Sequence, residues 1–242
     1  MMQAAEMRRP IPGAVATAGV DERMAFIRRT YGHLAGAVFA FVLVAAGLVT
    51  SGFADSMYAW IGQGQWNWLI LMGLFIGVGF LADKWANSDT SPGLQYLGLG
   101  IYVVAMAAIM TPLLYIAAYH PAFADYPLIP SAAMLTLLVF GGLTLTVFTT
   151  KKDFSFMRGA LVIGSFAALG IIVAAIAFGF ELGTLFAGAM IVLFSGWILY
   201  DTSQVLAHYR PTQHVAAALK LFSSVAMLFY YILYFLMSLT RD

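Results

Sequence analysis

The sequence contains no cysteine, and charged residues make up only 10% of its 242 residues. The absence of cysteine excludes disulfide bonds, cysteine-ligated zinc, iron–sulfur clusters and thiol chemistry. Twelve Lys and Arg against eleven Asp and Glu leave a formal net charge of +1, so nothing favours a nucleic-acid partner. Residues 1–30 also lack an apolar stretch long enough for the core of a signal peptide, so no cleaved leader is expected.

Hydrophobic residues, in contrast, account for 62% of the chain. Ordinary globular domains carry about a quarter charged residues, and a membrane span needs about 20 apolar ones. The sequence therefore predicts an all-α, polytopic membrane protein with seven transmembrane helices. The predicted spans are residues 34–53, 66–83, 95–118, 128–149, 159–180, 183–206 and 214–239. The weakest break is Glu181–Gly183, and a single bent span across it would reduce the count to six.

The loop charges favour seven spans with a cytoplasmic N-terminus and an external C-terminus. This arrangement places ten of the twelve Lys and Arg residues on the inner side, as the positive-inside rule requires. These ten are Arg8, Arg9, Arg23, Arg28, Arg29, Lys84, Lys151, Lys152, Arg158 and Arg210. We expect residues 1–30 to form a disordered cytosolic tail and residues 31–242 to form the transmembrane domain.

Asp201 is the first candidate for a functional residue, because it is the only charge between Glu181 and Arg210. An ionisable group inside a span is costly and usually faces a cavity or a partner. Lys220 lies at matched depth on the next span, since the two residues are ten and nine positions from Pro211. We therefore expect Asp201 and Lys220 to lie on facing helix surfaces, within direct or water-bridged reach.

Several of these charges have simpler interpretations that the sequence leaves open. Lys220 can extend its side chain to the interface instead of pairing, and Asp201 can serve only as a structural partner for it. Asp83 is expected at the interface beside Lys84, and His33 is expected to be a satisfied polar residue rather than a metal ligand. We expect no dedicated metal site and no cofactor.

Small residues recur at helical spacing in several spans: Gly32 with Gly36, Gly73 with Gly77, and Gly188 near Ser195 and Gly196. Such pairs let the backbones of neighbouring membrane helices approach closely. We therefore expect these glycines to serve helix packing.

The nonapeptide Gly196-Trp197-Ile198-Leu199-Tyr200-Asp201-Thr202-Ser203-Gln204 resembles the end of the sixth span in the Bax inhibitor (transmembrane Bax-inhibitor-motif) family. Weaker similarity includes Ala218-Leu219-Lys220-Leu221-Phe222 in the seventh span. The resemblance implies six helices around a central seventh, in the plasma membrane for members of bacterial type. It also implies a slow, pH-sensitive calcium leak, with calcium as the permeant ion.

The resemblance implies that the leak is closed by two hydrogen-bonded aspartates, one each in the sixth and seventh spans. Asp201 matches the first, whereas the second falls on Ser224, so this chain departs from the pattern. The resemblance further implies a basic counter-residue at the inner end of the second span, where this chain has Asp83 followed by Lys84. The predicted ion pathway and gate thus consist of Asp201, Lys220, Ser224 and Asp83.

The leading functional hypothesis is a passive cation leak in a bacterial inner membrane, gated around Asp201. The alternative is a non-conducting interaction protein that engages a membrane-bound AAA protease or other membrane partners through its N-terminal tail. Enzymatic readings are weak, because a serine protease built on Ser195 lacks a histidine at matched depth. A retinal pigment is disfavoured because Lys220 lies near the inner end of its span. We therefore expect no enzyme.

Overall fold

The computed structural model describes residues 13–88, 91–150 and 152–241, and it is helical throughout its long elements. Within these residues, seven helices are long and apolar enough to cross a membrane, which confirms the predicted count. They are α2 (Val20–Thr50), α4 (Gln65–Ala86), α5 (Pro92–Tyr119), α6 (Leu128–Thr150), α7 (Arg158–Phe178), α8 (Thr184–Ala207) and α9 (His214–Arg241).

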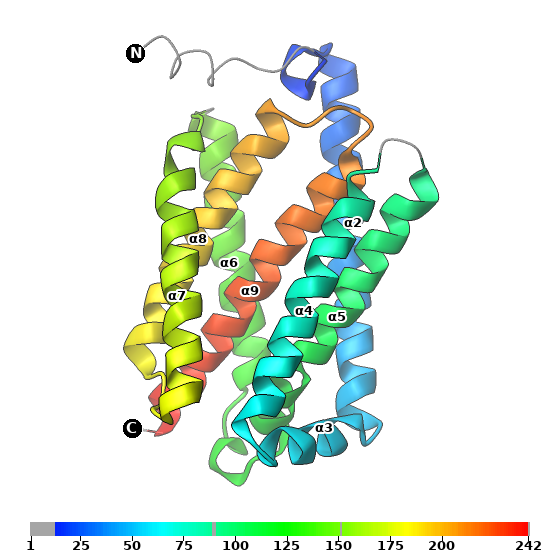
Figure 1. Cartoon of the computed structure of the whole chain (residues 1–242). Coiled ribbons are helices and arrows are strands. Elements are labelled where there is room, and N and C mark those ends of the chain that lie inside the picture. The colour runs from blue at the N-terminus through cyan, green and yellow to red at the C-terminus, as the bar shows by residue number, and fades with distance from the viewer. Residues whose placement is uncertain (1–12, 89–90, 151, 242) are drawn as a thin grey trace.

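Helix α9 is the centre of the bundle (Figure 1). It packs against α2, α4, α5, α6 and α8, whereas α7 lies outside α8. Its buried side chains include Leu221, Leu228 and Leu233, all fully shielded. The helices around it instead expose large apolar side chains such as Leu185 and Phe80 outward, as surfaces that face lipid do. The expected central seventh helix is therefore confirmed.

The turns follow ordinary helix-end chemistry. Helix α5 starts with Pro92 after Ser91, whose hydroxyl accepts from the backbone N–H of Leu94. Helix α7 ends at Gly179, whose φ of 73° is readily adopted by glycine. Residues 179–183 then separate α7 from α8, so the two predicted spans are distinct. The Tyr234 hydroxyl donates to the Leu182 carbonyl and anchors this turn to α9.

The two ends of the bundle carry opposite charge. At one end lie the start of α2 and the α4–α5, α6–α7 and α8–α9 connections, with Arg23, Lys84, Lys152 and Arg210 among their residues. We call this the basic end. At the opposite end, α3 (Phe53–Gly62) lies across the bundle, too short to span it, and Asp55 accepts from the Tyr115 hydroxyl. We call this the acidic end.

The expected tail is wrong for residues 13–30. Helix α2 already begins at Val20, and a short 3-10 helix, η1 (Val15–Thr17), precedes it. Val15 is fully buried, and its N–H donates to the Tyr209 carbonyl at 2.8 Å. Apolar contact and a backbone hydrogen bond thus hold this segment on the basic end. The remainder of the expected tail, residues 1–12, lies outside the described residues.

The packing role expected for the glycine pairs is also wrong at Gly32, Gly36, Gly73 and Gly77. A Cβ atom added at any of these four glycines would meet no heavy atom within 4 Å. The prediction holds at Gly196 on α8, where an added Cβ would lie 2.7 Å from Leu161 Cδ2. Gly98 on α5, which was not predicted, is also tight, because an added Cβ would lie 2.6 Å from the Ala82 carbonyl oxygen. Spacing along one helix does not say which face meets a neighbour, and this explains the error.

Candidate ion site around the central helix

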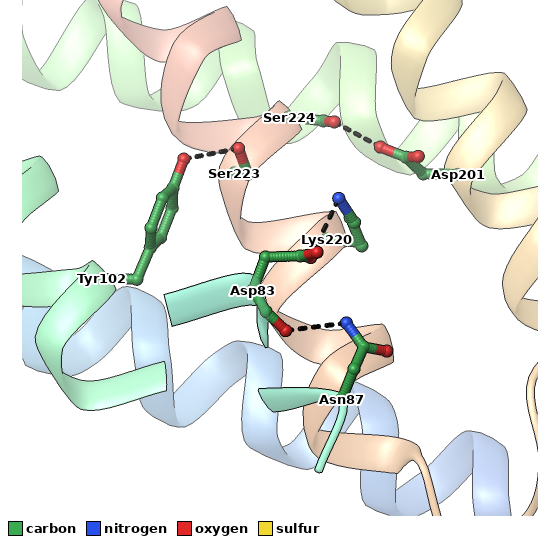
Figure 2. A network of polar contacts seen from close by, with 7 residues as sticks. All are labelled: Asp83, Asn87, Tyr102, Asp201, Lys220, Ser223 and Ser224. Atoms are coloured by element: carbon green, nitrogen blue, oxygen red, sulfur yellow. Dashed lines mark hydrogen bonds and ion pairs between the residues drawn. The ribbon is translucent and has the colours of Figure 1, made fainter. Parts of the chain in front are cut away.

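Asp201 lies in the last third of α8 with its side chain turned toward α9 (Figure 2). Asp201 is only 8% exposed, and the Ser224 hydroxyl donates a 2.5 Å hydrogen bond to Oδ2 of its carboxylate. Ser224 is itself buried. A short bond from a hydroxyl to a carboxylate is among the stronger hydrogen bonds in proteins. This bond therefore ties α8 to the central helix.

Lys220 lies one turn earlier on α9 and pairs with a different helix. Its Nζ is 3.0 Å from Oδ1 of Asp83 on α4. The backbone carbonyl of Asp83 also accepts a 2.8 Å bond from Asn87 Nδ2 in the next turn. Both charged side chains remain about 40% exposed in the isolated bundle. The pair ties α4 to α9 near the basic end.

Asp201 and Lys220, expected within direct or water-bridged reach of each other, each bind a different partner. Asp201 bonds to Ser224, and Lys220 pairs with Asp83. Lys220 remains close enough to act on Asp201 electrostatically. Matched depth did not identify the partner of Lys220, because Asp83 offers a carboxylate from α4. The pair with Lys220 was not predicted for Asp83.

A third contact joins the central helix to α5. The Ser223 hydroxyl and the Tyr102 hydroxyl are 2.7 Å apart, and either can donate. Sequence reasoning missed Tyr102, Ser223 and Asn87. The adjacency of Ser223 to Ser224 was the only available signal, because Tyr102 comes from a helix whose rotation the sequence does not specify.

The four predicted residues therefore converge around one stretch of α9. With both carboxylates ionised, Asp83 and Asp201 carry two negative charges and Lys220 one positive charge, which leaves a net charge of −1. Intramembrane charges usually mark ion pathways or proton relays. Carboxylate and hydroxyl oxygens are also the ligands that hard cations such as Ca²⁺ accept.

His33 and His214 lie together at the basic end. His33 on α2 lies with its ring centroid 4.9 Å from that of His214, and its Nε2 is 3.0 Å from the Tyr96 hydroxyl. Within the described residues, no group of three or more His, Asp or Glu side chains is arranged to hold a metal ion. Burial raises the pKa of Tyr209, in the α8–α9 loop, above its usual range, so that phenol is neutral.

Seven membrane-spanning helices with α9 at their centre, and a buried aspartate on α8, define a multi-pass membrane protein of the Bax inhibitor type. The model of the family described as Inhibitor of apoptosis-promoting Bax1 matches residues 23–241, and the chain belongs to this family.

Curated relatives span viruses, plants and bacteria. The chain is 30% identical to the Golgi anti-apoptotic protein of Vaccinia virus (strain Lister), over 91% of this chain and 88% of the relative. It is 28% identical to Protein LIFEGUARD 3 of Arabidopsis thaliana, over 97% and 92% respectively. It is 30% identical to an uncharacterized membrane protein of Vibrio cholerae, over 78% and 82%.

Proposed function

We propose that this protein is a passive cation leak, with calcium as the permeant ion, and that its gate is formed around Asp201. The observation that carries the proposal is the excess of carboxylate over ammonium in the cluster around α9, which includes the buried Asp201–Ser224 bond. An unbalanced intramembrane carboxylate attracts a cation or a proton. The cluster therefore offers both a cation site and a group whose charge changes with pH.

We take the described conformation to be the closed state of this proposed gate, because Asp201 and Ser224 are both buried. Opening requires α8 to move away from α9, which breaks the Asp201–Ser224 bond. The Asp83–Lys220 pair is a second restraint, because it holds α4 to the same stretch of α9. Protonation of Asp201 would replace a charge-assisted bond by a weaker neutral one, so the proton is the proposed trigger.

The proposed setting is a bacterial inner membrane with the basic end in the cytoplasm. The support is the distribution of charge: the described loops at the acidic end contain Asp55, Asp125 and Glu181 but no Lys or Arg. The bacterial relative named as a membrane protein agrees with this setting. The proposal includes no enzymatic step and no cofactor.

The test is calcium uptake into proteoliposomes between pH 5 and pH 8, with Asp201→Asn as the variant. The parent is expected to admit calcium at a rate that depends on pH, and the variant to lose that dependence. Asp153→Asn is the control, because Asp153 is a loop carboxylate that caps Ser155 and lies outside the cluster. The channel proposal fails if the folded parent passes no calcium, or if Asp201→Asn keeps the parental pH profile.

Failure would favour the alternative, a non-conducting protein that binds a membrane protease or another membrane partner. The structure offers one observation against its simplest form. Residues 14 and 15, in the segment expected to make the contact, are buried on the basic end. A partner that docks there would have to displace the Val15–Tyr209 hydrogen bond.

A further inference from the structure

A groove runs between α2 and α5 on the outside of the bundle, away from the ion site. Its volume is about 540 Å³, and it is lined by residues of these two helices alone. On α2 the lining runs from Arg29 to Val44, and on α5 from Tyr96 to Val104. At 1.5 Å per residue the α2 side is about 22 Å long, most of the thickness of a hydrocarbon core.

Glycines keep this groove open. Gly32, Gly36 and Gly100 all line it, and a Cβ added to any of them would meet no protein atom within 4 Å. Gly98, two residues before Gly100 on α5, is closely packed instead, since an added Cβ there would collide with the backbone of α4. Helix packing therefore accounts for Gly98 but not for the three glycines of the groove.

The end of the groove nearest the basic end is polar. Arg29, His33 and Tyr96 line it, whereas the part beyond Gly36 is formed by Ala37, Ala40 and aliphatic residues. His33 Nδ1 donates to the Arg29 carbonyl at 2.6 Å, because that oxygen can only accept. Nε2 of the same ring forms a 3.0 Å hydrogen bond with the Tyr96 hydroxyl. This chain of bonds fixes the imidazole beside the guanidinium.

The guanidinium of Arg29 has no carboxylate partner within ion-pair distance among the described residues. Arg29 and Tyr96 also line a second cavity of about 540 Å³ that opens toward the basic end and includes His214 and Glu22. Glu22 is the one acidic residue in either lining. The groove thus combines a cationic, hydrogen-bonding head with a long apolar trough.

We propose that the α2–α5 groove binds one anionic membrane phospholipid, with its phosphate at the Arg29 guanidinium, next to the His33–Tyr96 pair, and one acyl chain along Gly32, Gly36 and Gly100. Arginine matches a phosphodiester because its planar fork donates two parallel hydrogen bonds. Basic pockets between helices at the membrane surface are a known class of lipid headgroup site. The apolar trough accommodates an acyl chain, and a soluble phosphate has no such chain.

The test uses native mass spectrometry of the full-length protein in detergent, titrated with dioleoyl phosphatidylglycerol and, separately, with dioleoyl phosphatidylcholine. The parent is expected to bind one phosphatidylglycerol about tenfold more tightly than phosphatidylcholine. Arg29→Gln should lower that affinity about tenfold. Arg28→Gln removes the same charge from a neighbouring exposed position outside both linings and should change it less than twofold.

A second pair of variants tests the trough. Gly36→Leu places a side chain in it, at a position where an added Cβ meets no heavy atom within 4 Å, and should weaken phosphatidylglycerol binding at least tenfold. Gly141→Leu, on the exposed face of α6, has equally open surroundings and should have no effect. Circular dichroism and the melting temperature check that each variant folds. If Gly36→Leu does not fold, Arg29→Gln still tests the lipid site.

Three results would overturn the lipid site. Equal losses for Arg28→Gln and Arg29→Gln would reduce it to general surface charge. Displacement of phosphatidylglycerol by millimolar glycerol 3-phosphate would assign the head to soluble phosphates, without a role for the chain. Equal affinity for phosphatidylcholine would remove the requirement for an anionic lipid.

Discussion

The Asp201–Ser224 bond can be tested against its neighbour on the same helix. Ser224→Ala removes the hydroxyl that donates to the Asp201 carboxylate, whereas Ser223→Ala removes the hydroxyl paired with Tyr102. The two substitutions delete the same atom one residue apart. They differ in which helix loses its link to α9, α8 in the first case and α5 in the second.

The expected magnitudes follow from the partners. A hydrogen bond to a charged group contributes about 1.5–3 kcal/mol, and a neutral pair about 1 kcal/mol. Both partner residues are buried, with Asp201 at 8% and Tyr102 at 7% exposure, so water does not readily replace the lost hydroxyl. Each kcal/mol corresponds to about 2–4 °C in the melting temperature of a chain of this size. Both variants should therefore melt earlier, Ser224→Ala more so.

Calcium flux separates the two variants. If the open state lacks the Asp201–Ser224 bond, its loss removes about 1.5–3 kcal/mol that favours the closed state. Each 1.4 kcal/mol is a factor of ten in an equilibrium, so Ser224→Ala should leak about tenfold faster or more. Ser223→Ala should leak at the parental rate. Ser224→Thr, which keeps the hydroxyl, should also leak at the parental rate. Equal flux in the two alanine variants would refute this account of the gate.

Three further outcomes are expected. Gly98→Ala should lower the free energy of unfolding by about 1–3 kcal/mol, because the new Cβ would lie 2.6 Å from the Ala82 carbonyl oxygen. Gly100→Ala, whose new Cβ meets no heavy atom within 4 Å, should not lower it, and thermal denaturation in detergent compares the two variants. Ser224→Asp should steepen the pH dependence of flux, since two carboxylates at this distance share a proton; an unchanged profile would exclude such coupling. A C-terminal tag should be cleaved by protease only from outside the cell, and cleavage only from the cytoplasm would overturn the proposed orientation.

The sequence was sufficient for the spans because the thickness of the hydrocarbon core sets their length. The seven predicted segments fall on α2 and α4–α9, including the separation of α7 from α8 at Glu181–Gly183. The position of α3 was missed, because ten residues of mixed polarity between two spans give no length signal. The ordered segment before residue 31 was missed as well, since its contact with Tyr209 is made across the fold.

The sequence also indicated which charges gather near the central helix, because distance along a span fixes depth. Depth is only one coordinate, and the rotation of each helix and its lateral neighbours are decided by packing. That is why Lys220 pairs with Asp83 from α4, while Asp201 bonds to Ser224. The same limit applies to glycine: the spacing of Gly32 and Gly36 is visible in the sequence, but only the tertiary structure shows that they face an open groove rather than a neighbouring helix.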